Sequence, residues 1–119
     1  MLEIKFTVPV IPPSVNHYIQ HTRSGIHYRT DEAESFAALV AISAGAWRGR
    51  RLEAEEVDLF INLGPGQRGD LDNFPKVVLD SLVRCGVIRS DATITELNVR
   101  KARAEVASTE ITVRGWLRD

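Results

Sequence analysis

Apolar residues recur along this chain with two different periods, and the order of those periods limits the fold that it can adopt. The segments 2–10 and 57–63 alternate apolar and other side chains, as a strand with one buried face does. The segments 31–46 and 74–83 instead repeat apolar residues every three or four positions, which is typical of a helix with one buried side. Two further strands are predicted at 94–102 and 109–117, so the expected order is β-α-β-α-β-β.

A chain of 119 residues favours a single domain that spans residues 1–119. Two helices packed on a mixed sheet of about four strands make a small α+β domain. We expect the last two strands to form an antiparallel pair around a turn at 103–108. The segment 14–30 shows no period and is interpreted as a long loop, and 48–56 as a solvated charged connection.

The most unusual chemistry lies where the second strand leads into the second helix. Residues 69–80 read GDLDNFPKVVLD, and we expect the helix to begin near Asp72 or Asn73, both of which are good helix caps. Carboxylates this close repel one another and lose hydration when they are buried, so such a segment usually binds a cation. Oxygen ligands favour Mg²⁺, with Mn²⁺ as a substitute.

Two interpretations of this segment stay open from its spacing alone. In the first, Asp70 and Asp72 bind a metal that activates water on a phosphodiester, Lys76 supports the phosphate, and Asp91 joins them from the entrance of the next strand. In the second, Asp72 only caps the helix, and Lys76 forms an exposed ion pair with Asp80 four residues later.

Charge and composition set further bounds. The net charge of −1 does not favour nucleic acid. If four aspartates belong to one metal cluster, however, the other 12 acidic residues face 15 Lys and Arg, and this surface of +3 is compatible with a polyanion.

No apolar run of about 18 residues occurs, and the N-terminus alternates rather than forming a signal-peptide core, so we expect no membrane span and a cytoplasmic protein. The single Cys85 cannot form an internal disulfide.

These motifs resemble the RusA-type Holliday junction resolvases, also called crossover junction endodeoxyribonucleases. The likeness runs through nearly the whole chain in the same order. It rests on Asp70-Leu71-Asp72-Asn73, Lys76, Leu79-Asp80-Ser81-Leu82, Gly86-Val87 and Asp91, with Pro12-Pro13-Ser14-x-Asn16 upstream and Lys101 downstream.

The resemblance implies a Mg²⁺-dependent homodimer that binds four-way DNA junctions and makes paired, symmetric nicks near the crossover. An isologous dimer suits this task because it offers one metal site to each of two opposed strands. The resemblance assigns the catalytic and metal-binding aspartates to Asp70, Asp72 and Asp91, with Lys76 as the supporting cation. Further candidates for DNA contact or support are Asn16, Arg68, Asn73 and Lys101. The alternative function is a junction-binding protein whose nuclease activity is weak or lost. We expect no small-molecule cofactor.

Overall fold

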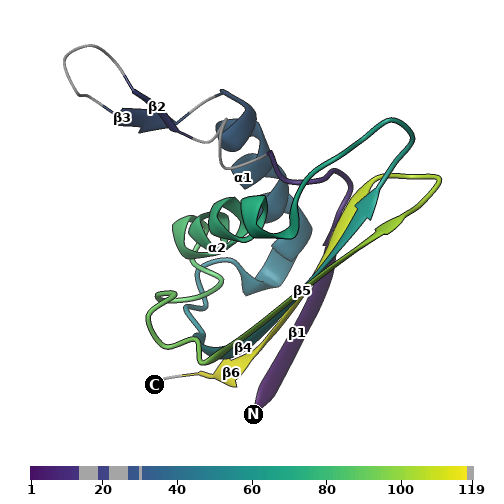
Figure 1. Ribbon diagram of the computed structural model, residues 1–119. Helices are drawn as coiled ribbons and strands as arrows, with labels where there is room; N and C mark the ends of the chain where they lie inside the picture. The colour runs from purple at the N-terminus through teal and green to yellow at the C-terminus, as the bar shows by residue number, and fades with distance from the viewer. Residues whose placement is uncertain (14–18, 22–26, 30, 118–119) are drawn as a thin grey trace.

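The computed structural model describes residues 1–13, 19–21, 27–29 and 31–117. A four-stranded mixed sheet in the order β1-β6-β4-β5 carries the helices α1 and α2 on one face (Figure 1). The strands are β1 Leu2–Val8, β4 Glu53–Leu63, β5 Glu96–Arg103 and β6 Ser108–Trp116, and the helices are α1 Asp31–Ala44 and α2 Pro75–Arg84. A 3₁₀ turn, η2 (Gly45–Trp47), extends α1. The predicted α+β class is confirmed. None of the helices in these ranges is long and apolar enough to cross a membrane.

The central strand β4 pairs antiparallel with β6 on one side and parallel with β5 on the other. Its odd-numbered residues from Val57 to Leu63 are buried in the core, whereas Asp58, Phe60 and Asn62 face the opposite side of the sheet. The strand begins at Glu53, so the expectation that 53–56 belongs to a solvated connection was wrong. Pairing with β6 satisfies the backbone there, and the three glutamates of this segment stay partly exposed.

The expected antiparallel pairing of the last two strands was also wrong, because β4 lies between β5 and β6. The chain leaves β4, crosses over the sheet through α2 and returns as β5 in the same direction as β4. A crossover connection of this kind gives a parallel pair. The strand β6 then fills the place between β4 and β1, antiparallel to both.

A second, two-stranded sheet lies within the segment that we interpreted as a loop. β2 (Ile19–His21) pairs antiparallel with β3 (His27–Arg29). Strands of three residues are too short to display an alternating period, so the sequence pattern could not reveal them.

The helix α2 begins at Pro75, later than the predicted start near Asp72 or Asn73. The preceding residues form a separate 3₁₀ turn, η3 (Leu71–Asn73). Proline suits the first helical position because its missing N–H has no partner there in any case. Gly86, just beyond the helix end, has a φ of 74°, a conformation that glycine adopts without steric cost.

Candidate functional site

Asp70 and Asp72, separated in the sequence by Leu71, lie at the exposed entrance to α2. The N–H of Asn73 donates to the carbonyl oxygen of Asp70 over 3.0 Å and closes the turn η3. Neither η3 nor α2 has a side-chain cap hydrogen bond, and the residue in the cap position of α2 is Phe74. The interpretation of Asp72 as a helix cap is therefore wrong. Both aspartates are exposed to solvent, which leaves their carboxylates accessible to a cation.

Two basic side chains of β5 hold the loop that presents Asp70. Lys101 Nζ donates to the carbonyl oxygen of Gly69 over 2.8 Å. The guanidinium of Arg103 donates to the carbonyl oxygens of Gly64 and Gln67 in the same loop. The sequence indicated Lys101 as a supporting residue, and Arg103 only as a second member of a basic strand face or a solvated strand edge. The signal for both was their spacing of two, which places the side chains on the same face of a strand; their contacts with the loop were not predicted.

A buried aromatic ring packs against the same loop. Phe74 is 1% exposed, and the backbone of Gly69 lies directly against its ring. A Cβ atom added at position 69 would lie only 2.0 Å from Phe74 Cζ, so glycine is the residue that allows this close approach. Sequence reasoning did not identify this contact. It ties the backbone just before Asp70 to the hydrophobic core.

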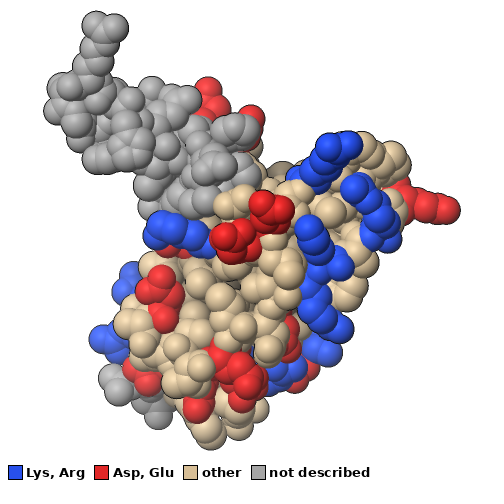
Figure 2. Space-filling model, viewed as in Figure 1, with Lys and Arg blue, Asp and Glu red and all other residues tan. Residues whose placement is uncertain are grey.

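The site combines both signs of charge at short range. Figure 2 shows acidic atoms over the start of α2 and basic atoms along the neighbouring edge of the sheet. The basic side chains in this region are exposed and include Arg68 in the loop and Lys101 and Arg103 on β5. Cations arranged beside a carboxylate pair can hold phosphates while the carboxylates hold a metal.

Lys76 lies in the first turn of α2, and its side chain is 58% exposed. Its Nζ is 3.7 Å from Asp80 Oδ2, the surface ion pair that the second interpretation of the sequence expected. Such exposed pairs contribute little to stability. The proposed contact of Lys76 with phosphate stays a prediction.

Asp91 lies at the far end of β5 from the other two aspartates. Its carbonyl oxygen accepts from the N–H of Ile94, and Thr95 then pairs with Glu55 near the start of β4. Lys101, which touches the loop before Asp70, stands six residues further along β5. At about 3.3 Å per residue, roughly 20 Å of strand separates the two ends. The expected convergence of all three aspartates does not occur within one chain.

The described parts of the chain accordingly contain no group of three or more His, Cys, Asp or Glu side chains placed to hold a metal. Two carboxylates are nevertheless sufficient for Mg²⁺, which usually keeps several waters and also binds substrate phosphate oxygens. The donor set of Asp70 and Asp72 fits this ion. The assignment of Asp91 as a ligand stays a prediction.

The remaining candidates for DNA contact differ in their surroundings. Arg68 is exposed on the loop before the aspartates, whereas Asn73 is half-buried and contributes its backbone to η3. Asn16 lies outside the described residues. Contacts of these residues with DNA stay predictions.

A family model described as "Endodeoxyribonuclease RusA" matches residues 9–114. This range includes both helices, the strands β4 and β5, most of β6 and the aspartates discussed above, whereas β1 lies before it. A comparison with curated proteins gives no match.

Proposed function

Because this chain belongs to the RusA endodeoxyribonuclease family, we propose that it hydrolyses phosphodiester bonds at four-way DNA junctions with carboxylate-bound Mg²⁺. The family comprises endonucleases that resolve Holliday junctions and act on branched DNA. The observation that carries the metal-dependent part is the pair of solvent-facing carboxylates, Asp70 and Asp72, neither of which makes a side-chain cap hydrogen bond to η3 or α2. A pair of like charges that serves no structural purpose is best explained by a ligand.

In this proposal Asp70 and Asp72 are the residues that would hold the ion. When bound, Mg²⁺ lowers the pKa of a water molecule and offsets negative charge on the phosphate. Lys101 positions the pair by holding the carbonyl oxygen of Gly69, and it does not need to touch the reacting atoms. Lys76 approaches the phosphate from the first turn of α2, and Arg68 contacts the DNA backbone.

We further propose that the protein is a homodimer and that Asp91 completes the site of the partner copy. Within one chain Asp91 and Asp70 lie at opposite ends of β5, which is an edge strand of the sheet. Two β5 edges that face each other antiparallel would bring the Asp91 end of one copy toward the Asp70 end of the other. Twofold symmetry then yields two equivalent sites and paired, symmetric nicks.

Mixing two inactive variants tests this arrangement. If Asp91 acts in the partner's site, a heterodimer of Asp72→Asn and Asp91→Asn copies has one site with both defects and one intact site. The mixture should then nick one strand of the junction, although neither variant alone is active. If Asp91 acts within its own chain, every site carries a defect, and the mixture should stay inactive.

The alternative function is a protein that binds junctions but cleaves them weakly or not at all. One observation favours it. Among the described residues, Asp70 and Asp72 lie near one end of β5 and Asp91 near the other, so no three acidic ligands are grouped within one chain. A labelled synthetic four-way junction, incubated with protein and Mg²⁺ beside a linear duplex with the same arms, separates the two functions. Symmetric nicks in the junction alone support the nuclease, and a bound but intact junction supports the alternative.

The variants Asp70→Asn and Asp72→Asn should each abolish cleavage while junction binding persists, because they remove metal ligands and leave the basic side chains in place. Glu105→Gln is the matched control, since Glu105 is an exposed acid in the β5–β6 turn outside the site. Cleavage by either aspartate variant at the rate of this control would contradict the proposed metal site.

A further inference from the structure

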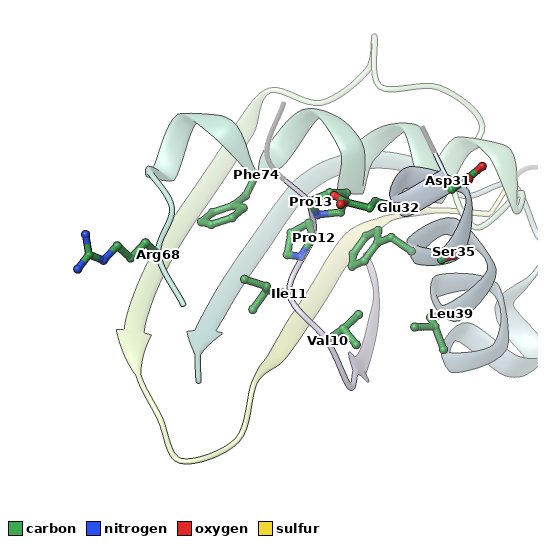
Figure 3. A pocket seen from close by; sticks show the side chains of 11 residues that line it. Val10, Ile11, Pro12, Pro13, Asp31, Glu32, Ser35, Leu39, Arg68 and Phe74 are labelled. Atoms are coloured by element: carbon green, nitrogen blue, oxygen red, sulfur yellow. The ribbon is translucent and has the colours of Figure 1, made fainter. Parts of the chain in front are cut away.

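A cavity of about 620 Å³ opens next to the acidic site. It lies between the chain that follows β1, the first turns of α1 and the loop before η3 (Figure 3). Its walls are mainly apolar and include Ile11, Pro12, Pro13, Phe36, Leu39 and Phe74. Its size lies within the range of about 300–1,000 Å³ that is usual for small-molecule sites.

Polar groups occur at the rim of this cavity. Figure 3 shows Glu32 beside Pro13 on the α1 side, and Arg68 at the opposite end with its guanidinium directed outward. Ser35 is exposed on α1 and also lines the cavity. A ligand that fits has apolar faces, hydrogen-bond donors at one edge and a negative charge near Arg68.

The cavity is coupled to the acidic site through one side chain. Phe74 forms part of the cavity wall, and the same ring supports the backbone of Gly69 immediately before Asp70. A ligand packed in this cavity therefore lies one aromatic ring away from the backbone that carries the first metal ligand.

We propose that this cavity receives a nucleobase unstacked from the branch point of the junction, an inference that rests on the proposed function. A base has two apolar faces for the proline and phenylalanine walls. Its exocyclic amino group can donate to the Glu32 carboxylate, as cytosine N4 does to acidic side chains. The phosphate of the same nucleotide matches Arg68. A phosphate group by itself would gain little from the apolar walls and would be repelled by Glu32.

Such a pocket would help the protein to distinguish a junction from a linear duplex. Taking a base out of a continuous duplex costs a few kcal/mol of stacking and pairing energy, and the cost is lowest where pairing is already disturbed. Bases at the branch point of an open junction are still paired, but the helical stack ends there, so the stacking part of this cost is lower. Binding of the base then stabilises the loop at the point where the branched DNA meets the metal ligands.

The test compares two tryptophan variants on α1. Ser35→Trp places a large ring over the cavity, whereas Ile42→Trp changes a residue two turns away on the same helix face, where Ile42 is 72% exposed. Dissociation constants are measured without divalent metal for an intact junction, for a junction with abasic sites at the branch point and for a linear duplex. This readout does not depend on cleavage.

For the wild type, removal of the branch-point bases should weaken junction binding about tenfold, within the range for loss of one base–aromatic contact. Ser35→Trp should bind the intact junction about tenfold more weakly and lose nothing further with abasic DNA, while Ile42→Trp behaves as the wild type. Equal binding of intact and abasic junctions by the wild type would overturn the inference. Two other results would also overturn it. One is that Ser35→Trp and the abasic sites weaken junction binding independently, so that their effects on the dissociation constant multiply. The other is that Ser35→Trp weakens binding through a change in oligomeric state.

Failure of the proposed function gives a different result. A wild-type protein that neither prefers the junction over the duplex nor cleaves it with Mg²⁺ contradicts the function itself. A wild type that prefers and cleaves the junction, but is insensitive to the branch-point bases, contradicts only the base pocket.

Discussion

The contact between Gly69 and Phe74 predicts that a single methyl group disturbs the site. In Gly69→Ala the new Cβ would meet Phe74 Cζ at 2.0 Å and two further ring atoms at 2.8 and 2.9 Å. Ordinary contacts begin near 3.4 Å, so the ring or the loop has to move by more than 1 Å. Gly69 does not have a positive φ, which means that the clash, and not backbone strain, is the effect of the substitution.

The loop should move, because Phe74 is 1% exposed and fixed in the core, whereas Asp70 is exposed. A misplacement of about 1 Å in an active site can reduce the rate ~100-fold, and we expect a loss of that order in junction cleavage. Overpacking costs about 1–3 kcal/mol of folding free energy. Replacement of glycine by alanine offsets about 0.4–1 kcal/mol of this cost, because it reduces the conformational entropy of the unfolded chain. The melting temperature should therefore fall by ten degrees at most, at ~4 °C per kcal/mol for a domain of this size.

Cleavage of a labelled junction under single-turnover conditions and thermal unfolding measure the two effects. The control is the double variant Gly69→Ala/Phe74→Leu, because leucine lacks the outer ring atoms that clash with the new Cβ. Gly69→Ala should slow cleavage less when it is added to Phe74→Leu than when it is added to the wild type. Wild-type cleavage together with a raised melting temperature in Gly69→Ala would refute the packing of the loop on the ring.

Three further predictions concern the same site and the opposite face of the sheet. Lys101→Met should slow cleavage about tenfold in single-turnover assays, since it removes a charged hydrogen bond worth about 1.5 kcal/mol from the loop. Mg²⁺ at 100 times its dissociation constant should stabilise the protein by about 2.7 kcal/mol in thermal unfolding, and this gain should be lost in Asp72→Asn. Arg114→Gln should lower the melting temperature at pH 7, but by less in acid. Hydrogen bonds from Asn98 and, to a smaller extent, from Arg114 lower the pKa of Asp58 from its ordinary value of 3.8. These bonds therefore stabilise the fold fully above that value, and their contribution is lost as the pH falls through the lowered pKa. A melting-temperature difference that does not change between pH 7 and pH 3 would contradict this role of Asp58.

The local elements could be predicted because their causes are local. The period of apolar residues in 31–44 and the glycine after α2 depend on neighbours within one or two turns, and both helices were found. The strand partners could not be predicted in this way. Whether β5 pairs with β4 or β6 depends on the side from which the crossover returns, and the alternating pattern of β5 itself is the same in either place.

The acidic segment shows the same division. Its spacing indicated a metal site at Asp70 and Asp72, but it left open whether Asp72 was used as a helix cap. The structure decided this because Asp72 lies within the separate 3₁₀ turn η3, and Phe74 takes the cap position of α2. The spacing also suggested that Asp91 returns to the same place, an expectation that the direction of β5 does not meet within one chain.

The sequence by itself determined the α+β class, the family and the clustering of carboxylates before the second helix, since these follow from short-range patterns and from motifs in a fixed order. Only the tertiary structure decided which of those residues meet. Lys101 reaches Gly69 across 32 positions of sequence, and Phe74 supports the same loop, because the crossover through α2 lays β5 beside β4 in one particular register. That register sets contacts between distant segments, and no local period encodes it.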